Sequence, residues 1–274
     1  MKAETARKYA ALKGCLSKLE SVAVAFSAGV DSTLLLKVAT DVLGADNVLA
    51  VMGRSPSVPV AELTSAATLT DEISVSIQFV DTCEFDDPRY IANSSERCYF
   101  CKTEMFSRIK KLAAERGFQT VISGANADDR HDFRPGRKAA DEHGVRAPLA
   151  ECGVSKAELR EIAAELNLSI HDKPASPCLS SRVPYGEPVT PEKLRRIDDA
   201  ETFLREHGFR ECRVRHHGAL ARIETSPEQI TRFQNAEFRD RVDARLRELG
   251  FKYVTLDLRG FRSGSLNEVL DTEL

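Results

Sequence analysis

The chain has 274 residues, of which 42% are hydrophobic and 30% charged, and its formal net charge is −3. This length predicts one large or two smaller domains, and the slight acidity argues against a protein built chiefly to grip nucleic acid. No apolar run approaches the roughly 20 residues of a membrane span, and the amphipathic N-terminus lacks the apolar stretch of a signal peptide. The 7 cysteines are an odd, scattered set. Such a set fits a reducing compartment, so we expect a cytoplasmic protein.

Short apolar or β-branched runs alternate with helical patterns through the first two-thirds of the chain. Strands are expected at 21–26, 47–52, 75–80 and 120–123, with helices at 32–43, 59–70, 100–116 and 156–167. Ser155 and Glu158 have the spacing of a capping box before the last helix. This alternation predicts βαβ units, a parallel sheet and helices on both of its faces.

The stretch 169–191 is rich in Pro and Ser, has no clear period and reads as a linker. Beyond it we expect a helix to about His207, a hairpin of 211–215 and 219–224, helices near 227–233 and 236–249, and a strand at 253–258. The predicted fold class is α/β, with a Rossmann-like parallel-sheet domain over 1–179. A small α+β domain over 180–274 is expected to serve substrate binding and oligomerisation, which makes a homo-oligomer the expected state.

The strongest motif joins the first strand to the first following helix, in the stretch VAVAFSAGVDSTLLLKVA. A loop of small residues at this junction lets backbone N–H groups and the helix dipole converge on an anion. Ser27, Gly29 and Ser32 are therefore candidate phosphate ligands, and Asp31 is assigned to Mg²⁺. No Lys follows, so this is not a Walker-type loop. The motif resembles the SGGxDS loop of the PP-loop ATP pyrophosphatases, with Ala28 in place of the first Gly.

A second glycine turn, VISGANADD, follows the strand that ends near Ser123. Gly124 permits close backbone approach, and Asp128 and Asp129 supply carboxylates at the carboxyl end of the sheet, where ligands of open α/β sheets bind. An ordinary acidic turn is the alternative interpretation. The resemblance to PP-loop enzymes implies a nucleotide here, held by Gly124 and Asp128.

Three thiols are candidate metal ligands. Cys98 and Cys101 form a C-x-x-C pair at a helix start, which also suits a redox pair, half of a zinc site or plain packing. Cys178, in the polar stretch SPCLSS, is the natural third ligand for a [4Fe–4S] cluster with one open iron. The remaining thiols are interpreted as structural: Cys15, Cys83, Cys152 and Cys212.

The segment CRVRHHGALARIE carries paired arginines. Arg213 and Arg215 are two apart on a strand, so they share a face and suit bidentate phosphate recognition, with Glu224 to orient them or to hold a divalent ion. Arg182, four residues after Cys178, is a further candidate phosphate ligand. A solvated hairpin face is the alternative.

Taken together, AFSAGVDSTLLLKVA, RCYFCK, GANADD, PCLSSRVPYGE and RVRHHGALARIE resemble the LarE family over nearly the whole chain. This family of sulfur transferases acts on pyridinium-3,5-biscarboxylic acid mononucleotide during synthesis of the nickel-pincer cofactor of lactate racemase. The resemblance implies ATP and Mg²⁺ as cofactors and an adenylated carboxylate. It implies that the four phosphate-site residues of the second domain hold the mononucleotide phosphate: Arg182, Arg213, Arg215 and Glu224. Other nickel-pincer biosynthesis proteins are possible partners.

The resemblance implies two versions of the sulfur step. In one, catalytic Cys178 attacks as a thiolate and gives up its own sulfur, leaving dehydroalanine. In the other, which we favour because all three thiols are present, Cys98, Cys101 and Cys178 hold a [4Fe–4S] cluster that carries a replaceable sulfide. The other hypotheses are a PP-loop tRNA thiolase, an ammonia-using amide synthetase and a non-enzymatic ATP-binding or iron–sulfur carrier. We expect neither stable nucleic acid binding nor a membrane partner.

Overall fold

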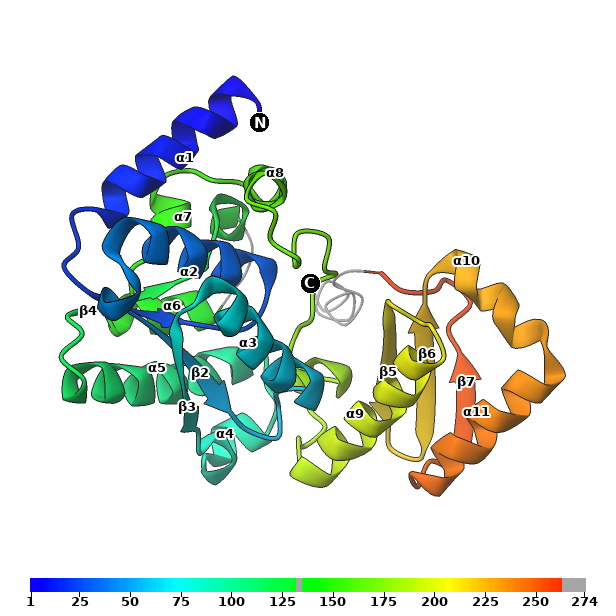
Figure 1. Ribbon diagram of the computed structural model, residues 1–274. Helices are drawn as coiled ribbons and strands as arrows, with labels where there is room; N and C mark the ends of the chain where they lie inside the picture. The colour runs from blue at the N-terminus through cyan, green and yellow to red at the C-terminus, as the bar shows by residue number, and fades with distance from the viewer. Residues whose placement is uncertain (132–134, 263–274) are drawn as a thin grey trace. The chain divides into compact units, whose positions relative to one another are not determined.

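The computed structural model of the protein describes residues 1–131 and 135–262 (Figure 1). The described chain forms two compact units, one of residues 1–90 and 95–176, the other of residues 91–94 and 177–262. The sequence placed the boundary after residue 179. Because it falls after residue 176, Cys178 belongs to the second unit.

The first unit is built on a parallel four-stranded sheet. Its strands are β1 (Val22–Ala25), β2 (Val48–Arg54), β3 (Ser76–Asp81) and β4 (Thr120–Ser123), in the order β3-β2-β1-β4. The four strands expected from the apolar runs are confirmed. The order reverses at β1, because β2 and β3 extend the sheet on one side and β4 on the other. Open α/β sheets bind ligands at such a switch point, beyond the carboxyl ends of the strands.

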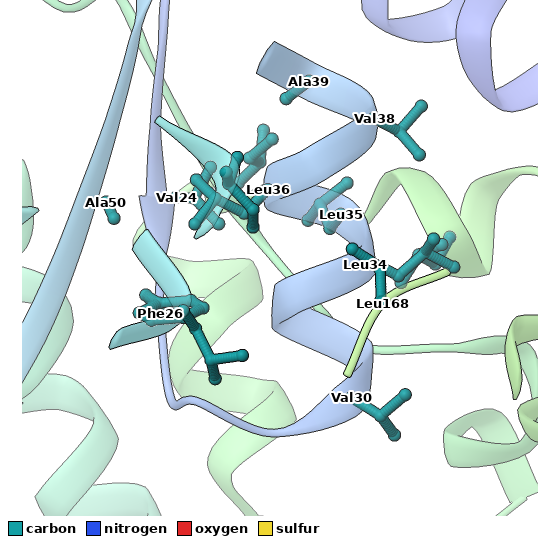
Figure 2. Close-up of a cluster of buried hydrophobic side chains, with 14 of the residues drawn as sticks. Val24, Phe26, Val30, Leu34, Leu35, Leu36, Val38, Ala39, Ala50 and Leu168 are labelled. Atoms are coloured by element: carbon teal, nitrogen blue, oxygen red, sulfur yellow. The ribbon is translucent and has the colours of Figure 1, made fainter. Parts of the chain in front are cut away.

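Helices cover both faces of this sheet, as predicted (Figure 1). One face packs against α1 (Ala3–Leu16), α2 (Val30–Leu43), α3 (Val60–Ile73) and α8 (Lys156–Glu165), and the other against α5 (Arg97–Glu115) and α6 (Pro135–Glu142). Alternate strand residues supply the two cores, with Val22 and Val24 on the first face and Ala23 on the second. The leucine-rich side of α2 fills the first core (Figure 2).

The sequence patterns did not predict several short elements. They are α4 (Pro88–Ile91), α7 (Pro148–Glu151), and the 3₁₀ turns η1 (Ala45–Asn47), η2 (Glu84–Asp86) and η3 (Ala127–His131). A segment of three to five residues is too short to show a hydrophobic period, which is why sequence analysis passes over it. The start of α8 was predictable, since the Ser155–Glu158 capping box is present.

The second unit is a small α+β domain. Strands β5 (Cys212–His217) and β6 (Leu220–Thr225) form the predicted antiparallel hairpin, and β7 (Tyr253–Leu256) pairs parallel with β6. The helices α9 (Pro191–Glu206), α10 (Pro227–Ile230) and α11 (Ala236–Glu248) and the turns η4 (Leu179–Arg182) and η5 (Thr231–Gln234) complete it. Its core joins α9 and α11 to one sheet face. No helix in the described part of the chain is long and apolar enough to cross a membrane.

Candidate functional site

The loop between β1 and α2 has the geometry of an anion site. Ala28 lies in the left-handed region at φ +54° and is fully buried. Ser27 N–H donates to Ser32 Oγ at 3.2 Å, the two hydroxyl oxygens lie 3.1 Å apart, and Ser32 Oγ donates to the Gly29 carbonyl at 3.1 Å. These contacts place two hydroxyls at the N-terminus of a 14-residue helix. The positive end of the helix dipole then favours a phosphate group there.

The glycine turn after β4 lies directly against this loop. A Cβ atom on Gly124 would lie 2.8 Å from Ser32 N and 3.0 Å from the Asp31 carbonyl carbon. The close approach expected of Gly124 therefore exists, and its partner is the backbone of the first loop. The sheet brings the two turns together because β1 and β4 are neighbours on either side of the switch point.

Asp128 positions a helix that contributes to the same region. Its Oδ2 accepts the Lys156 N–H at 2.9 Å, and its own N–H donates to Asn126 Oδ1 at 3.0 Å. Asp129 Oδ2 accepts the Asn126 N–H at 2.9 Å. The turn is thus held by its own side chains, and Asp128 ties it to the start of α8.

Two lysines that the sequence analysis did not single out lie at the loop. Lys156 Nζ lies 2.5 Å from Asp31 Oδ2, across 125 positions of sequence. Lys173 Nζ donates to the Ala28 carbonyl at 3.1 Å and lies 2.6 Å from Glu62 Oε2. Both ammonium groups therefore reach the loop from distant segments of the chain. The sequence signal that could have pointed to Lys173 is its position as a basic residue within the irregular stretch 169–191.

Asp31 fits the Mg²⁺ that the family resemblance implies. Its Oδ1 is buried and has no hydrogen-bond partner among the residues that the structure describes, while Oδ2 is paired with Lys156. Carboxylate oxygen is a preferred Mg²⁺ ligand, and a buried oxygen without a partner is costly unless a ligand fills that position. Asp31 would therefore hold the ion next to phosphate oxygens at Ser27 and Ser32.

The three thiols are divided between the two units. Cys98 and Cys101 lie in the first turns of α5, as expected, and Cys178 immediately precedes η4 in the second unit. Across residues 1–131 and 135–262, no three His, Cys, Asp or Glu side chains gather closely enough to hold a metal ion. The shared cluster stays a prediction.

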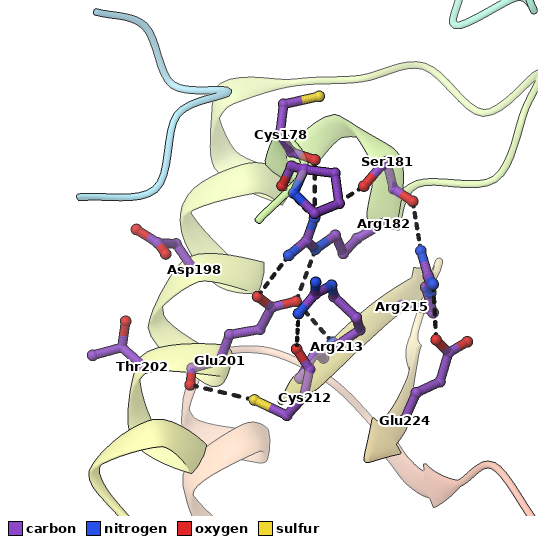
Figure 3. Close-up of polar contacts among 12 residues, drawn as sticks. Cys178, Ser181, Arg182, Asp198, Glu201, Thr202, Cys212, Arg213, Arg215 and Glu224 are labelled. Carbon is purple, nitrogen blue, oxygen red and sulfur yellow. Dashed lines mark hydrogen bonds and ion pairs between the residues drawn. The ribbon is translucent and has the colours of Figure 1, made fainter. Parts of the chain in front are cut away.

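Arg182 fixes the backbone at Cys178 (Figure 3). Its Nη1 donates to the carbonyls of Pro177 at 2.6 Å and Cys178 at 3.1 Å, and its Nε and Nη2 form a two-pronged ion pair with Glu201. Both side chains are at most 1% exposed. Burial alone would lower the pKa of Arg182, but the charge and hydrogen bonds of Glu201 raise it. Arg182 was predicted as a phosphate ligand, and the contacts seen here are with protein groups.

The paired arginines of β5 lie on one face, as their spacing predicts (Figure 3). Arg215 donates from Nη2 to Glu224 Oε2 at 2.8 Å and from Nη1 to the Ser181 carbonyl at 2.7 Å. Arg213 donates to the Cys212 carbonyl at 2.7 Å, and burial followed by the charge of Arg182 lowers its pKa. Glu224 thus orients Arg215. A phosphate role for these residues stays a prediction.

The remaining thiols differ in setting. Cys83 is exposed, and Cys15 and Cys152 are partly exposed. Cys212 is buried in the core of the second unit, and this burial raises its pKa to about 12. For Cys212 the structural interpretation is confirmed, because a neutral buried thiol is a poor nucleophile.

The chain is similar to known proteins along most of its length. No protein-family model matches the chain. An uncharacterized protein of Synechocystis is 47% identical over 260 residues, covering 94% of this chain and 96% of that protein. The pyridinium-3,5-bisthiocarboxylic acid mononucleotide synthase of Lactiplantibacillus plantarum is 41% identical over 268 residues, covering 98% and 96%. An uncharacterized protein of Methanocaldococcus jannaschii is 28% identical over 246 residues. Full-length similarity at this level shows that the chain belongs to the LarE family, the family of the pyridinium-3,5-bisthiocarboxylic acid mononucleotide synthases.

Proposed function

We propose that this chain is an ATP-dependent sulfur transferase that converts a carboxylate of pyridinium-3,5-biscarboxylic acid mononucleotide into a thiocarboxylate. The observation that carries the proposal is the 41% identity, over 98% of the chain, to the synthase of L. plantarum. The anion site at the switch point supports the ATP-dependent half of the reaction.

In the first step, a substrate carboxylate oxygen attacks the α-phosphorus of ATP. Pyrophosphate leaves, and the carboxylate becomes an acyl adenylate whose leaving group is AMP. The Ser27 and Ser32 hydroxyls and the α2 N-terminus bind phosphate oxygens. Asp31 would hold Mg²⁺, which would neutralise phosphate charge. Lys156 and Lys173 add positive charge beside the loop, and this charge stabilises the negative charge that develops on the leaving pyrophosphate.

In the second step, sulfur attacks the activated carbonyl carbon and AMP leaves. Arg182 acts on this step by holding the carbonyl groups of Pro177 and Cys178 in place. Arg213 and Arg215 bind the substrate phosphate, and Glu224 orients Arg215. If Cys178 is the donor, its thiolate forms a thioester. Cys178 then loses its Cα proton to a base as its Cβ–S bond breaks, which releases the thiocarboxylate and leaves dehydroalanine. A [4Fe–4S] cluster on Cys98, Cys101 and Cys178 would supply a replaceable sulfide, and it remains our favoured sulfur source.

The reaction is tested with the purified chain, ATP, Mg²⁺ and the pyridinium substrate. We expect pyrophosphate release that depends on the substrate, together with a product in which sulfur replaces a carboxyl oxygen by mass spectrometry. Pyrophosphate release without substrate, or substrate recovered unchanged, would contradict the proposal.

The sulfur source is tested by the intact mass of the protein after one turnover. Loss of the mass of hydrogen sulfide from Cys178 indicates sacrifice, and an unchanged mass with product formed indicates the cluster. Cys178→Ala should still release pyrophosphate but form no thiocarboxylate. Cys83→Ala, an exposed thiol, is the matched control and should do both.

A further inference from the structure

One face of α8 carries two basic side chains, Lys156 and Arg160, which are four positions apart and therefore neighbours on the helix surface. Lys156 pairs with Asp31 of the loop between β1 and α2, at 2.5 Å between Nζ and Oδ2. Arg160 donates to two backbone carbonyls, to that of His171 from Nη1 at 2.6 Å and to that of Lys173 from Nη2 at 2.7 Å. The rigid fork of a guanidinium lets one side chain hold both carbonyls.

The segment that Arg160 holds is a turn that begins soon after α8. The His171 N–H donates to the Leu168 carbonyl at 3.2 Å, and the Lys173 N–H donates to the Ile170 carbonyl at 3.0 Å. Leu168 and Ile170 are buried in the first core. Core packing therefore anchors the start of the turn, and Arg160 holds its end.

Lys173 is the residue through which this turn contacts the loop between β1 and α2. Its Nζ donates to the Ala28 carbonyl at 3.1 Å, and it lies 2.6 Å from Glu62 Oε2 and 3.5 Å from Ser65 Oγ. A lysine side chain is a flexible four-carbon stem, so the place that its ammonium group can reach depends on where its own backbone is held. Arg160 supplies that constraint at the Lys173 carbonyl.

We propose that Arg160 is a positioning residue for ATP, which fixes the backbone of Lys173 and so holds the Lys173 ammonium group beside the phosphate loop. This inference rests on the proposed function, because it requires that the loop binds ATP. One face of α8 then provides two cations at the loop, Lys156 directly and Lys173 through Arg160. Because Arg160 acts through Lys173, its removal should weaken ATP binding only while Lys173 is present.

The test measures the Kd of α,β-methylene ATP, in the presence of Mg²⁺, for the full chain by isothermal titration calorimetry. Arg160→Met should raise the Kd several-fold, and Lys173→Met should raise it at least as much. The double variant should bind as weakly as Lys173→Met alone, since both changes remove the same interaction. A merely structural role of Arg160 would instead give additive losses.

A second variant covers the case in which Arg160→Met does not fold. Arg160→Lys keeps the charge and the aliphatic stem but lacks the fork, so its Kd should lie between those of the wild-type chain and Lys173→Met. It too should have no further effect once Lys173 is replaced.

Arg108→Met is the matched control, because Arg108 is an exposed arginine of α5 that pairs with Glu104. Its Kd should equal that of the wild-type chain. An unchanged Kd for the Arg160 variants, or additive losses when they are combined with Lys173→Met, would overturn the inference. If the wild-type chain does not bind the analogue, the proposed ATP site is itself wrong and the inference fails with it.

Discussion

Ala28 adopts a backbone conformation that alanine disfavours. Its φ of +54° lies in the left-handed region, which glycine adopts without steric cost. Alanine in this region costs roughly 1 kcal/mol relative to glycine. Its methyl group belongs to the first core, and its carbonyl accepts from Lys173. Burial of one methyl is worth about 0.8 kcal/mol, so packing offsets most of the strain. The sequence showed that a family glycine is replaced here, and the structure shows the compensation.

Gly124→Ala is expected to destabilise the first unit by about 1–3 kcal/mol, because its Cβ would overlap the backbone at the start of α2. Chemical denaturation with and without ATP measures the effect, and ATP should bind more weakly as the two turns separate. Gly14→Ala is the matched control. It lies in α1 with no atom within 4 Å of the added methyl, so it should stabilise the chain by about 0.5–1 kcal/mol. Equal effects of the two changes would refute the close-approach argument.

Lys156→Met should raise the KM for ATP by about 10- to 100-fold, since loss of a charge-assisted contact costs roughly 1.5–3 kcal/mol and leaves Asp31 without its cation. Substrate-dependent pyrophosphate release across a range of ATP concentrations measures it. Lys8→Met is the control. Lys8, in α1, forms an ion pair with Glu158 of α8, the helix that Lys156 begins, but it does not contact Asp31. An unchanged KM for Lys156→Met would remove this lysine from the ATP site.

At the scale of elements, the order of the strands brings together the parts of the proposed ATP site. The loop after β1, the turn after β4 and the start of α8 come from three separate stretches of chain, and Asp128 and Lys156 join the last two. Each element start was recognisable in the sequence from a glycine, a strand end or a capping box. Their meeting depends on which strands are neighbours, and local patterns do not encode that order.

In the second unit, Glu201 connects η4, α9 and β5. It pairs with Arg182 and accepts the Val214 N–H at 3.0 Å. Burial alone would raise the pKa of Glu201, but the charge and hydrogen bonds of Arg182 lower it below the usual 4.5. A carboxyl with a depressed folded-state pKa contributes its full stability above pH 4.5. That contribution is lost as the pH falls through the folded-state value.

Glu201→Gln is therefore expected to lower stability at pH 7 by about 3–5 kcal/mol, because it leaves a buried guanidinium without its carboxylate. Below pH 4.5 the difference from the wild-type chain should shrink, because the carboxyl of the unfolded wild-type chain then takes up a proton while the folded one stays ionised down to its lowered pKa. Urea denaturation between pH 3 and pH 7 measures both effects. Asp243→Asn, which breaks an exposed pair with Arg247, should change stability by less than about 1 kcal/mol. A constant difference at all pH values would rule out the ionised pair.

For the whole molecule, net charge separates the proposed activity from a tRNA thiolase. A chain of formal net charge −3 lacks the basic surplus that backbone neutralisation needs. We expect no salt-sensitive binding of tRNA in gel-shift or fluorescence titrations, and no effect of tRNA on pyrophosphate release. Tight tRNA binding that weakens steeply with salt would favour the thiolase hypothesis.

The sequence by itself determined the strands, the longer helices, the anion loop and the family, because each is written in local periodicity or in contiguous motifs. Only the tertiary structure decided that Lys156 and Lys173 serve a loop 125 or more positions away. It also decided that Arg182 is buried together with Glu201. These are pairings between distant segments, and they follow from strand order and helix packing. A buried arginine and an exposed one look the same in a sequence, because burial is a property of the assembled fold.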